Sequence, residues 1–357
     1  MPCAPRYGPP SADIGEEGNG YVDLNNGDFY HRDASGWSFV LNIKGPQGEQ
    51  GVQGPQGTSG TNGADFTRLI GINLKRIALK LPPYAYPTYI LNGAFSLRGI
   101  CFDGAYVWVG DEVNLYKLNI SDGSVAATYT PNVYFWFLVS DGTYIWACPS
   151  GGNLYRINTA TGVATSFSIG IGANRACCDG TYVYVVGDSN TSIVKVKASN
   201  GSVVATYTIP NGTHDVCFDE TYLWIACGSG SLVKMRASDG VTMATYSIAN
   251  MPYRVCFDGT NIWVGTWTDT SLRKVSMSDG TVLGCYNMGA RPIALVFDGS
   301  YIWYLGGSSA TQIRPSNGAV VGTYATGATA GNGVYDGCFD GSSLWLSNYN
   351  SANVGRL

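Results

Sequence analysis

One short phrase of sequence returns along most of this chain at a nearly constant interval, and it restricts the fold more than any other feature. Its first copy, from Cys101 to Val109, reads CFDGAYVWV. The aspartate of this phrase recurs with successive spacings of 38, 38, 40, 39, 40 and 42 residues. Self-similarity at a fixed period of about 20–50 residues is the signature of a repeat architecture. The repeated aspartates are Asp103, Asp141, Asp179, Asp219, Asp258, Asp298 and Asp340.

Each repeat contains four short runs of strand-forming residues, and turn dipeptides, mostly Asp-Gly, follow the first and the third run. Asp-Gly predicts a type I′ hairpin turn, because such a turn needs positive φ at both central positions. Four strands repeated about every 40 residues are typical of β-propeller blades. A β-sandwich is the alternative, but it gives no reason for a fixed period with Asp-Gly at two constant offsets. In the repeat of Asp258, the strands are expected at 254–257, 261–267, 271–277 and 281–288.

The seven copies of the phrase predict an all-β fold, a seven-bladed β-propeller of four-stranded blades over residues 84–357. The last repeat is incomplete, because Asn353–Leu357 matches a third strand and no fourth strand follows it. The missing strand is expected upstream, since Thr88–Gly93 resembles Thr206–Gly212. An N-terminal strand within 84–91 would close the last blade and remove the open sheet edges.

Glycine occupies every third position over seven triplets within residues 45–65. This is the collagen pattern, in which three chains wind together and only glycine fits at the crowded axis. A flexible Gly-rich linker keeps no strict period. Residues 45–65 are therefore predicted to form a collagen-like triple-helical stalk that makes the protein a homotrimer, with a disordered linker as the alternative. Because the triplets contain only two prolines, Pro46 and Pro55, such a triple helix should be weak alone and needs adjoining segments that also form trimers.

Three other segments lie outside the repeats. Residues 1–18 are rich in Pro, Gly and charge and are interpreted as a flexible or docking lead-in, and residues 19–44 as a small β module. The connector at 66–83 has apolar residues at heptad spacing, which favours a short trimeric coil. Further apolar residues blur this seam, and a β-strand fits nearly as well. The heptad positions are Ile70, Leu74, Ile77 and Leu81.

Composition argues against several classes of function. The net charge is −4, only 13% of the residues are charged, and no Lys/Arg-rich run is present, so nucleic acid is not an expected partner. The sequence contains no apolar run of about 18 residues, so insertion into a membrane is not expected. The sequence after Met1 has no apolar core of a signal peptide, so secretion by the ordinary route is not expected.

The ten cysteines predict free buried thiols rather than disulfides. Five of them lie two residues before a repeated aspartate, where other repeats have Val139 or Val296. A position that accepts Cys or Val is small, buried and apolar, and reduced thiols fit a protein folded in a cytosol. Because His31 and His214 are the only histidines, we predict no metal site, and no cofactor either. The five cysteines are Cys101, Cys177, Cys217, Cys256 and Cys338.

Two resemblances connect these patterns to known families. The repeated phrase resembles the bacterial YVTN-type propeller repeats, whose relatives include the virginiamycin B lyase-like seven-bladed propellers. Segments Gly20–Asp23, Gly27–Tyr30 and Asn42–Gly48 look like the small β module that leads into collagen-like segments of bacteriophage tail-fibre proteins. Together they imply a phage fibre that is made in the host cytoplasm and located on the virion. Its N-terminus would contact a virion or baseplate protein, and its distal head a receptor.

The order of the strands places two kinds of loop on opposite faces of the predicted propeller. The Asp-Gly turns lie on one face, which is nearly uniform among the repeats, whereas the connections on the other face vary. Variation among loops is where binding specificity can reside. The stalk and the C-terminus are expected on the uniform face, so the varied face points away from the stalk. The candidate ligand-binding residues there are Tyr134, Phe135, Trp136, Asn174, Arg175, His214, Asp215, Tyr253, Arg254, Trp267, Asp269 and Tyr349.

Four consecutive aromatic residues, Tyr134–Phe137, distinguish one connection from all the others. Exposed aromatic groups ringed by polar residues mark binding sites. Flat rings stack on apolar faces of a ligand while Arg and Asp orient it, so a glycan is the leading ligand. Alternatively, the rings close the channel mouth or pack between blades: this is expected of Phe137, and for Trp136 both interpretations are equally good. His214 is also explained as a hydrogen-bonded loop residue, and Trp146 and its equivalents as blade core.

These patterns favour a non-catalytic receptor-binding protein on a virion, with a host surface glycan or protein as its partner. Three heads on one shaft would raise a weak single-site affinity by about 10²–10⁴. One alternative is a structural or decoration role on the virion. Another is a lyase or a glycan-cleaving enzyme that uses Asp215 and Asp269, but glycoside hydrolysis needs carboxylates about 5–9.5 Å apart, which a sequence does not show. No catalytic residue is assigned.

Overall fold

A computed structural model describes the backbone of residues 20–23, 28–33 and 36–42, and residues 88–91, 94, 96–131, 133–149, 152–248, 251–328, 333–349 and 351–357. The chain divides into two compact units, Met1–Ala85 and Tyr86–Leu357. The predicted lead-in at 1–18, the collagen-like stalk at 45–65 and the connector at 66–83 lie outside the described residues.

In the first unit, the described residues form a three-stranded antiparallel sheet in the order β1-β2-β3. Its strands are β1 (Gly20–Asp23), β2 (Asp28–Asp33) and β3 (Gly36–Asn42). They lie within residues 19–44, the segment interpreted from the sequence as a small β module.

The second unit consists of antiparallel sheets. One sheet holds β5 (Ile100–Phe102), β6 (Tyr106–Gly110), β7 (Leu115–Asn119) and β8 (Val125–Tyr129). The next holds β9 (Phe137–Ser140), β10 (Tyr144–Cys148), β11 (Asn153–Asn158) and β12 (Ala164–Ser168). A longer sheet holds β13 (Arg175–Cys178), β14 (Tyr182–Val186), β15 (Asn190–Lys197), β16 (Val203–Phe218), β17 (Tyr222–Cys227), β18 (Ser231–Arg236) and β19 (Thr242–Ser247).

Three further four-stranded sheets follow. The first holds β20 (Pro252–Phe257), β21 (Asn261–Thr266), β22 (Ser271–Ser276) and β23 (Val282–Asn287). The second holds β24 (Ala294–Phe297), β25 (Ile302–Gly306), β26 (Ser309–Ile313) and β27 (Val320–Ala325). The third holds β28 (Val334–Phe339), β29 (Leu344–Asn348), β30 (Asn353–Arg356) and β4 (Thr88–Ile90).

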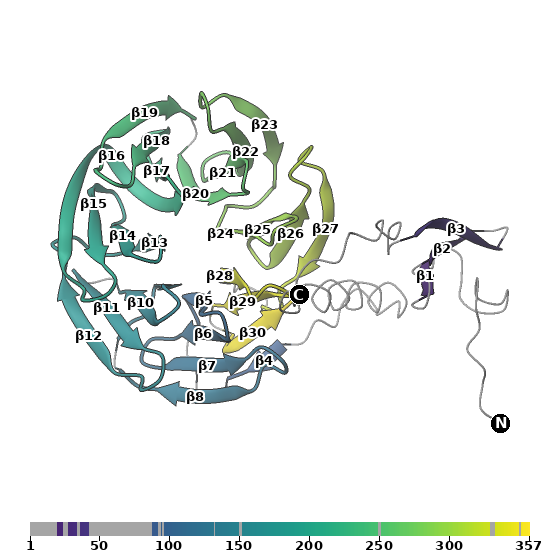
Figure 1. The fold of residues 1–357 in the computed structure, drawn as a ribbon, viewed down its shortest axis with the longest axis horizontal. Coiled ribbons are helices and arrows are strands. Elements are labelled where there is room, and N and C mark those ends of the chain that lie inside the picture. The colour runs from purple at the N-terminus through teal and green to yellow at the C-terminus, as the bar shows by residue number, and fades with distance from the viewer. Residues whose placement is uncertain are drawn as a thin grey trace, which may run out of the picture. The chain divides into compact units, whose positions relative to one another are not determined.

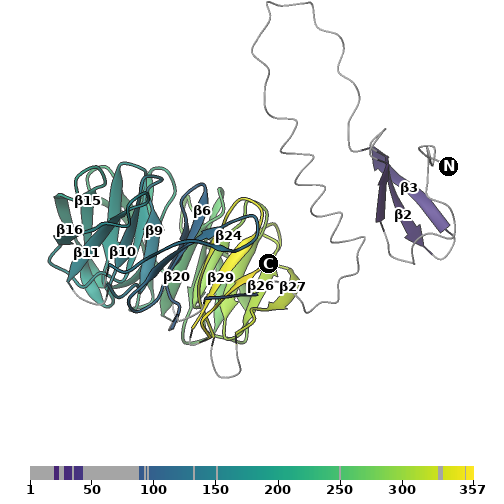
Figure 2. The same ribbon diagram turned by 90° about the horizontal axis from the view of Figure 1, so that it is seen from below.

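The described part of the second unit is therefore all-β and contains no helix. Figure 1 shows its sheets arranged around a common centre, with first strands innermost and fourth strands outermost. Seen from the side, the strands run between the two faces of a single thick layer (Figure 2). In the 16-residue β16, the fourth strand of one group continues into the first strand of the next, which joins two groups into the longer sheet. First strands contact one another in sequence from β5 to β28, and β28 contacts β5.

Strand β4 completes the last sheet, as the sequence predicts. It pairs with β30 in antiparallel register, Tyr89 opposite Val354 and Thr88 opposite Gly355. The ring of Tyr89 stacks on Trp345 with 5.5 Å between the ring centroids, and Leu91 is buried. The prediction that a segment within 84–91 supplies the missing strand is therefore confirmed for its described residues.

The repeated aspartate has a structural role that accounts for its recurrence. In the first repeat, Asp103 Oδ1 accepts hydrogen bonds from the backbone N–H groups of Ala105 and Tyr106, and Oδ2 accepts one from the indole of Trp108 at 2.7 Å. The same three bonds occur in the other repeats, with Tyr184 replacing the tryptophan in one of them. The tryptophans are buried between neighbouring sheets, which confirms that they belong to the core. They are Trp108, Trp146, Trp224, Trp263, Trp303 and Trp345.

The Asp-Gly turns differ from the predicted type I′ geometry. Asp103 N–H bonds to the carbonyl of Tyr106, so the two-residue loop consists of Gly104 and Ala105, and the aspartate precedes it. Of these loop residues only the glycine has positive φ, at 100°, as in a type II′ turn. The prediction was wrong because the aspartate side chain binds the loop N–H groups, which places it before the turn rather than inside it.

Successive sheets are joined by contacts that recur around the unit. A basic residue on the third strand donates to a carbonyl in the next sheet's loop between its third and fourth strands: Lys117 to Thr159 at 3.2 Å. In the last sheet, Arg356 donates in the same way to Ser121, also at 3.2 Å, in the first sheet. Each such bond ties the third strand of one sheet to a turn of its neighbour.

An aromatic ring on the fourth strand makes a second recurring contact. A Cβ added to Gly162 would lie 1.9 Å from the ring of Tyr129, which belongs to the preceding sheet. A Cβ on Gly123 would lie 2.3 Å from Tyr89 of β4 in the same way. The ring therefore requires glycine in the next sheet's turn.

One turn departs from the repeat, and we expect its correction to stabilise the protein. Glu220 has φ of 76° where equivalent residues such as Gly259 (φ 87°) are glycine. An L-residue in this region costs about 1–2 kcal/mol, partly offset by the greater freedom of glycine in the unfolded chain. Glu220→Gly should therefore raise the free energy of unfolding by about 0.5–1 kcal/mol, measured by urea denaturation.

The matched control is Gly259→Ala, because a Cβ there meets no atom within 4 Å and only the backbone conformation is tested. It should lower the free energy of unfolding by about 1 kcal/mol. A Glu220→Gly variant no more stable than the unchanged protein would contradict the assignment of strain to this turn.

The nine described cysteines are free thiols, and eight of them are buried or half-buried. Cys285 is exposed, which corrects the expectation of buried thiols throughout. It lies on β23, a fourth strand whose side chains alternate between exposed and half-buried positions. At the five positions that precede the repeated aspartates, burial raises the pKa of every thiol, so these groups stay protonated.

Candidate functional site

Two equivalent positions, at or just before the start of the first strands, collect most of the candidate residues. They lie five and four residues before each repeated aspartate, near the end of the sheets opposite the aspartate turns. Adjacent strand residues point to opposite sides, so the two sets have different surroundings. The outer set, five residues before, is Arg98, Trp136, Asn174, His214, Tyr253, Ile293 and Tyr335. The inner set, four residues before, is Gly99, Phe137, Arg175, Asp215, Arg254, Ala294 and Asp336.

The upper cavity, with a volume of 400 Å³, lies among the outer set. Two inner-set arginines, Arg175 and Arg254, also line it, and Trp267 and Tyr349 reach it from connections between second and third strands. The outer-set residues in its wall are Arg98, Trp136, Tyr253, Ile293 and Tyr335. The structure thus brings together six of the predicted residues, from repeats far apart in sequence: Trp136, Arg175, Tyr253, Arg254, Trp267 and Tyr349.

A buried arginine organises one side of the upper cavity. The Arg98 guanidinium lies 4.6 Å from the ring centroid of Trp136 and 4.8 Å from that of Tyr349, with Tyr134 and Tyr335 at 5.0 and 5.3 Å. Each contact is a cation–π interaction. Arg98 Nη2 donates to the Tyr134 hydroxyl at 3.0 Å. Burial lowers the pKa of Arg98, but the tyrosine hydroxyls around it together raise that pKa by more, so the group stays charged.

The opposite side is built from an aromatic series that starts at His214. The His214 ring lies 5.0 Å from that of Tyr253, which lies 4.5 Å from Trp267. Arg291 lies over Trp267 at 4.6 Å. His214 is buried, and its Nδ1 is 2.7 Å from Asp188 Oδ1, which favours the interpretation of His214 as a hydrogen-bonded structural residue. The His214 ring packs against the ring of Tyr253.

A smaller neighbouring cavity of 270 Å³ contains the remaining outer-set candidate. Asn174 and Trp136 line it together with Asp188. Trp136 therefore lies between two cavities and is half-buried. Its ring lines both cavities and contacts the Arg98 guanidinium, an arrangement compatible with either interpretation from the sequence.

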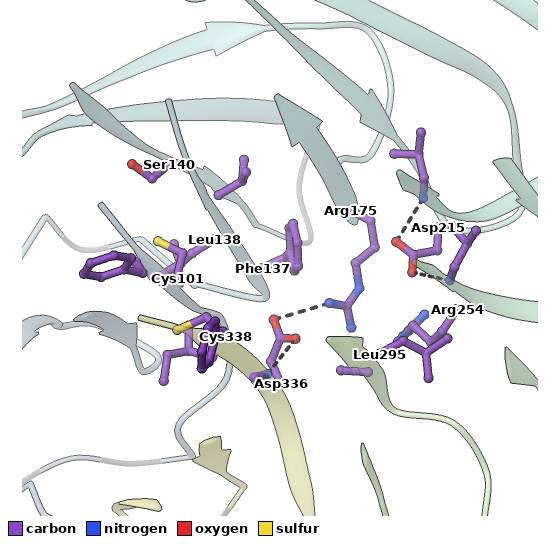
Figure 3. Close-up of a pocket in the computed structure, with 18 residues that line it drawn as sticks. Cys101, Phe137, Leu138, Ser140, Arg175, Asp215, Arg254, Leu295, Asp336 and Cys338 are labelled. Carbon is purple, nitrogen blue, oxygen red and sulfur yellow. Dashed lines mark hydrogen bonds and ion pairs between the residues drawn. The ribbon is translucent and has the colours of Figure 1, made fainter. Parts of the chain in front are cut away.

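The lower cavity, with a volume of 360 Å³, is lined by the first strands and by every member of the inner set except Gly99 (Figure 3). Arg175 Nη1 pairs with Asp336 Oδ2 at 3.4 Å, and both side chains are buried. Asp215 accepts hydrogen bonds from the backbone N–H groups of Val216 and Val255 at 2.9 and 3.1 Å. Arg175 and Arg254 line both cavities, so they form the boundary between them.

Burial and neighbouring charges shift the pKa values of the ionisable inner-set residues. Burial raises the pKa of Asp336 to about 6, although Arg175 beside it acts in the opposite direction. Burial, and next the positive charge of Arg175, lower the pKa of Arg254. A fully desolvated guanidinium near a second one favours a nearby negative charge.

Three of the predicted residues are placed differently from the expectation. Phe135 is fully buried in the core, where its ring fills the space beside Gly110, so it is not available to a ligand. Asp269 binds locally: its Oδ2 pairs with Arg273 at 2.7 Å and its Oδ1 with Ser271. Asp215 lines the lower cavity whereas Asp269 lines none of the three cavities, so the structure does not place these two carboxylates in one site.

Sequence reasoning missed Arg98, Tyr335 and Asp336. The first two belong to the outer set and the third to the inner set, at the same offsets from the repeated aspartate as His214 and Asp215. Applying that offset to every repeat, including the first and the last, would have found them. Tyr134, in contrast, was predicted, and it contacts the site through Arg98 and donates to Glu112 at 2.7 Å.

In comparisons with known proteins, no family model and no curated protein matches this chain. Within the described part of the chain, we find no helix with the length and apolarity needed to cross a bilayer. Over the same residues, no group of three or more His, Cys, Asp or Glu side chains is placed to hold a metal ion.

Proposed function

We propose that this protein is a receptor-binding appendage of a virion, a trimeric fibre whose propeller heads bind a glycan on a host surface. The observation that carries the proposal is the upper cavity. Its wall combines five aromatic side chains and three arginines at the end of the sheets away from the aspartate turns. Aromatic side chains with a few oriented polar groups are the usual composition of a ligand pocket.

The head is proposed to be a closed seven-bladed propeller. Support comes from contacts that continue from the last sheet to the first: β28 contacts β5, and Arg356 of β30 bonds to Ser121. The packing of Tyr89 on Gly123 repeats that of Tyr129 on Gly162. Each of these has a counterpart between earlier pairs of sheets, which is expected if every sheet has two equivalent neighbours.

The direction of β4 places its first residue, Thr88, at the end of the sheets opposite the upper cavity. Thr88 pairs with Gly355, close to the end of β30, while Ile90 pairs with Asn353 at its start. β4 therefore starts at the end of the sheets that carries the aspartate turns. The trimeric state and the virion location rest on the Gly-X-Y run at 45–65 and on the resemblance of residues 20–48 to tail-fibre modules.

A glycan array probed with the full-length protein tests the proposal. We expect binding to a defined subset of glycans and a loss of about tenfold or more for Trp136→Ala, because aromatic stacking and its burial contribute about 1–3 kcal/mol. The control is Tyr301→Ala, a half-buried ring beside the Asp298 turn at the opposite end, which should bind as the unchanged protein does. Unfolding curves verify that both variants fold. Binding that is absent from the array, or unaffected by Trp136→Ala, would refute the site.

A further inference from the structure

The charge of the upper cavity is unbalanced. Three arginines line it, Arg98, Arg175 and Arg254, and the exposed fraction of each is below one tenth. No Asp or Glu belongs to its wall. Asp336, which pairs with Arg175, and Asp215 line the lower cavity instead, and Glu112 accepts its hydrogen bond from Tyr134. The wall of the upper cavity is therefore positively charged.

Several donors at this cavity have no acceptor. Among the described residues, Arg98 Nε, Arg175 Nε and the indole Nε1 of Trp136 are buried without a hydrogen-bond partner. Leaving one buried donor unsatisfied costs about 1–3 kcal/mol, and more for a charged group. A buried donor without a partner in a native structure requires an explanation, and a bound group that supplies the acceptor is one. Two of the three carry positive charge, so an anionic oxygen satisfies them best.

The aromatic walls select what carries that anion. Tyr253 and Trp267 lie on one side, and Trp136, Tyr335 and Tyr349 on the other. Flat rings stack on the C–H face of a sugar, while an inorganic anion gains nothing from them. The volume of 400 Å³ is at the lower end of the range for ligand pockets, about 300–1,000 Å³, which suits a terminal sugar ring rather than a long chain.

We propose that the upper cavity binds the carboxylate of an acidic sugar at the end of a glycan. Arg254 and Arg175 hold the carboxylate at the floor of the cavity, because guanidinium and carboxylate geometries match, and the aromatic walls hold the sugar ring. This inference rests on the proposed glycan-binding function and names its ligand class. A bound anion would also offset the repulsion between the guanidinium groups of Arg175 and Arg254, which strengthens binding. That repulsion contributes, after burial, to the lowered pKa of Arg254.

The test is a tryptophan-fluorescence titration of the full-length protein, since Trp136 and Trp267 line the cavity. The probes are D-glucuronate, the neutral and equally large D-glucuronamide, and inorganic phosphate. We expect glucuronate to bind about tenfold or more tightly than glucuronamide, because hydrogen bonds to charged groups contribute about 1.5–3 kcal/mol. Phosphate should bind more weakly than glucuronate.

Variants locate the effect. Arg254→Gln should weaken glucuronate binding by about tenfold or more and leave glucuronamide unchanged. Because Arg175→Gln alone would leave Asp336 buried and unpaired, the double variant Arg175→Gln/Asp336→Asn keeps the pair neutral and should have the same effect. The control is Arg156→Gln: this arginine also lies over an aromatic ring, Tyr144 at 4.4 Å, but outside the cavities.

Equal affinity for glucuronate and glucuronamide, or for glucuronate and phosphate, would overturn the acidic-sugar assignment, as would unchanged binding by Arg254→Gln. These failures differ from failure of the proposed function. If the glycan array finds only neutral glycans that require Trp136, receptor binding stands and the acidic-sugar inference is wrong. If glucuronate binds as expected but no array glycan does, the pocket stands and the receptor-binding function is wrong.

Discussion

A chain that begins at residue 92 is expected to lose the folded state that a chain beginning at residue 86 retains. The difference removes β4, which supplies the fourth strand of the last sheet. It also removes Leu91, which is 1% exposed, and the stacking of Tyr89 on Trp345. Deleting a buried leucine side chain alone costs about 2–5 kcal/mol and an aromatic pair about 0.5–1.5 kcal/mol. These losses approach the whole stability of a typical domain, about 5–15 kcal/mol.

The exposed edge makes the truncation more severe than a core substitution. Without β4, the backbone groups of β30 along Asn353–Gly355 have no partner strand, and an unpaired edge promotes association between chains. Thermal unfolding and size-exclusion chromatography of the two chains provide the measurement. The shorter chain should aggregate or melt far below the longer one. Equal melting temperatures with both chains monomeric would show that β4 is dispensable, and would also argue against a closed propeller.

The repeats made the strands and the core predictable. Each strand needs only about five residues of strand-forming sequence, and a phrase that recurs seven times averages out the local ambiguity of any one copy. The upstream closing strand was predictable for the same reason, because Thr88–Gly93 could be matched to a complete repeat. Turn geometry was not, since Asp-Gly is compatible with turns that differ in whether the aspartate lies inside the loop.

The candidate site was predictable only in part, because it is assembled from many repeats. Arg98 bonds to Tyr349, which is 251 residues away in sequence, and no local pattern records that contact. Phe135 and Trp136 are adjacent and both aromatic, yet one is fully buried and the other is half-buried at a cavity. Their alternation follows from the direction of side chains along the backbone entering β9, which sequence alone does not locate to within one residue.

The second large effect is expected at the aspartate that anchors each turn. Asp340 is 8% exposed. Its Oδ1 accepts bonds from the N–H groups of Ser342 and Ser343, both at 2.7 Å, and its Oδ2 from the indole of Trp345 at 2.7 Å. Hydrogen bonds to a charged group contribute about 1.5–3 kcal/mol each, and a buried donor left unpaired adds a desolvation cost. Asp340→Ala is therefore expected to lower the free energy of unfolding by about 4 kcal/mol or more.

The comparison that isolates this role is Asp279→Ala, at a loop aspartate between a third and a fourth strand. Asp279 is exposed and accepts a bond from the N–H group of Thr281 at 3.1 Å, so its replacement should leave the free energy of unfolding nearly unchanged. Urea denaturation followed by tryptophan fluorescence measures both variants, and Trp345 reports directly on the anchored turn. Similar losses for the two variants would mean that the repeated aspartate acts as an ordinary turn residue. A loss confined to Asp340→Ala would show that the phrase recurs because each repeat needs its buried aromatic donor, an indole in all repeats but one, bonded to a charged acceptor.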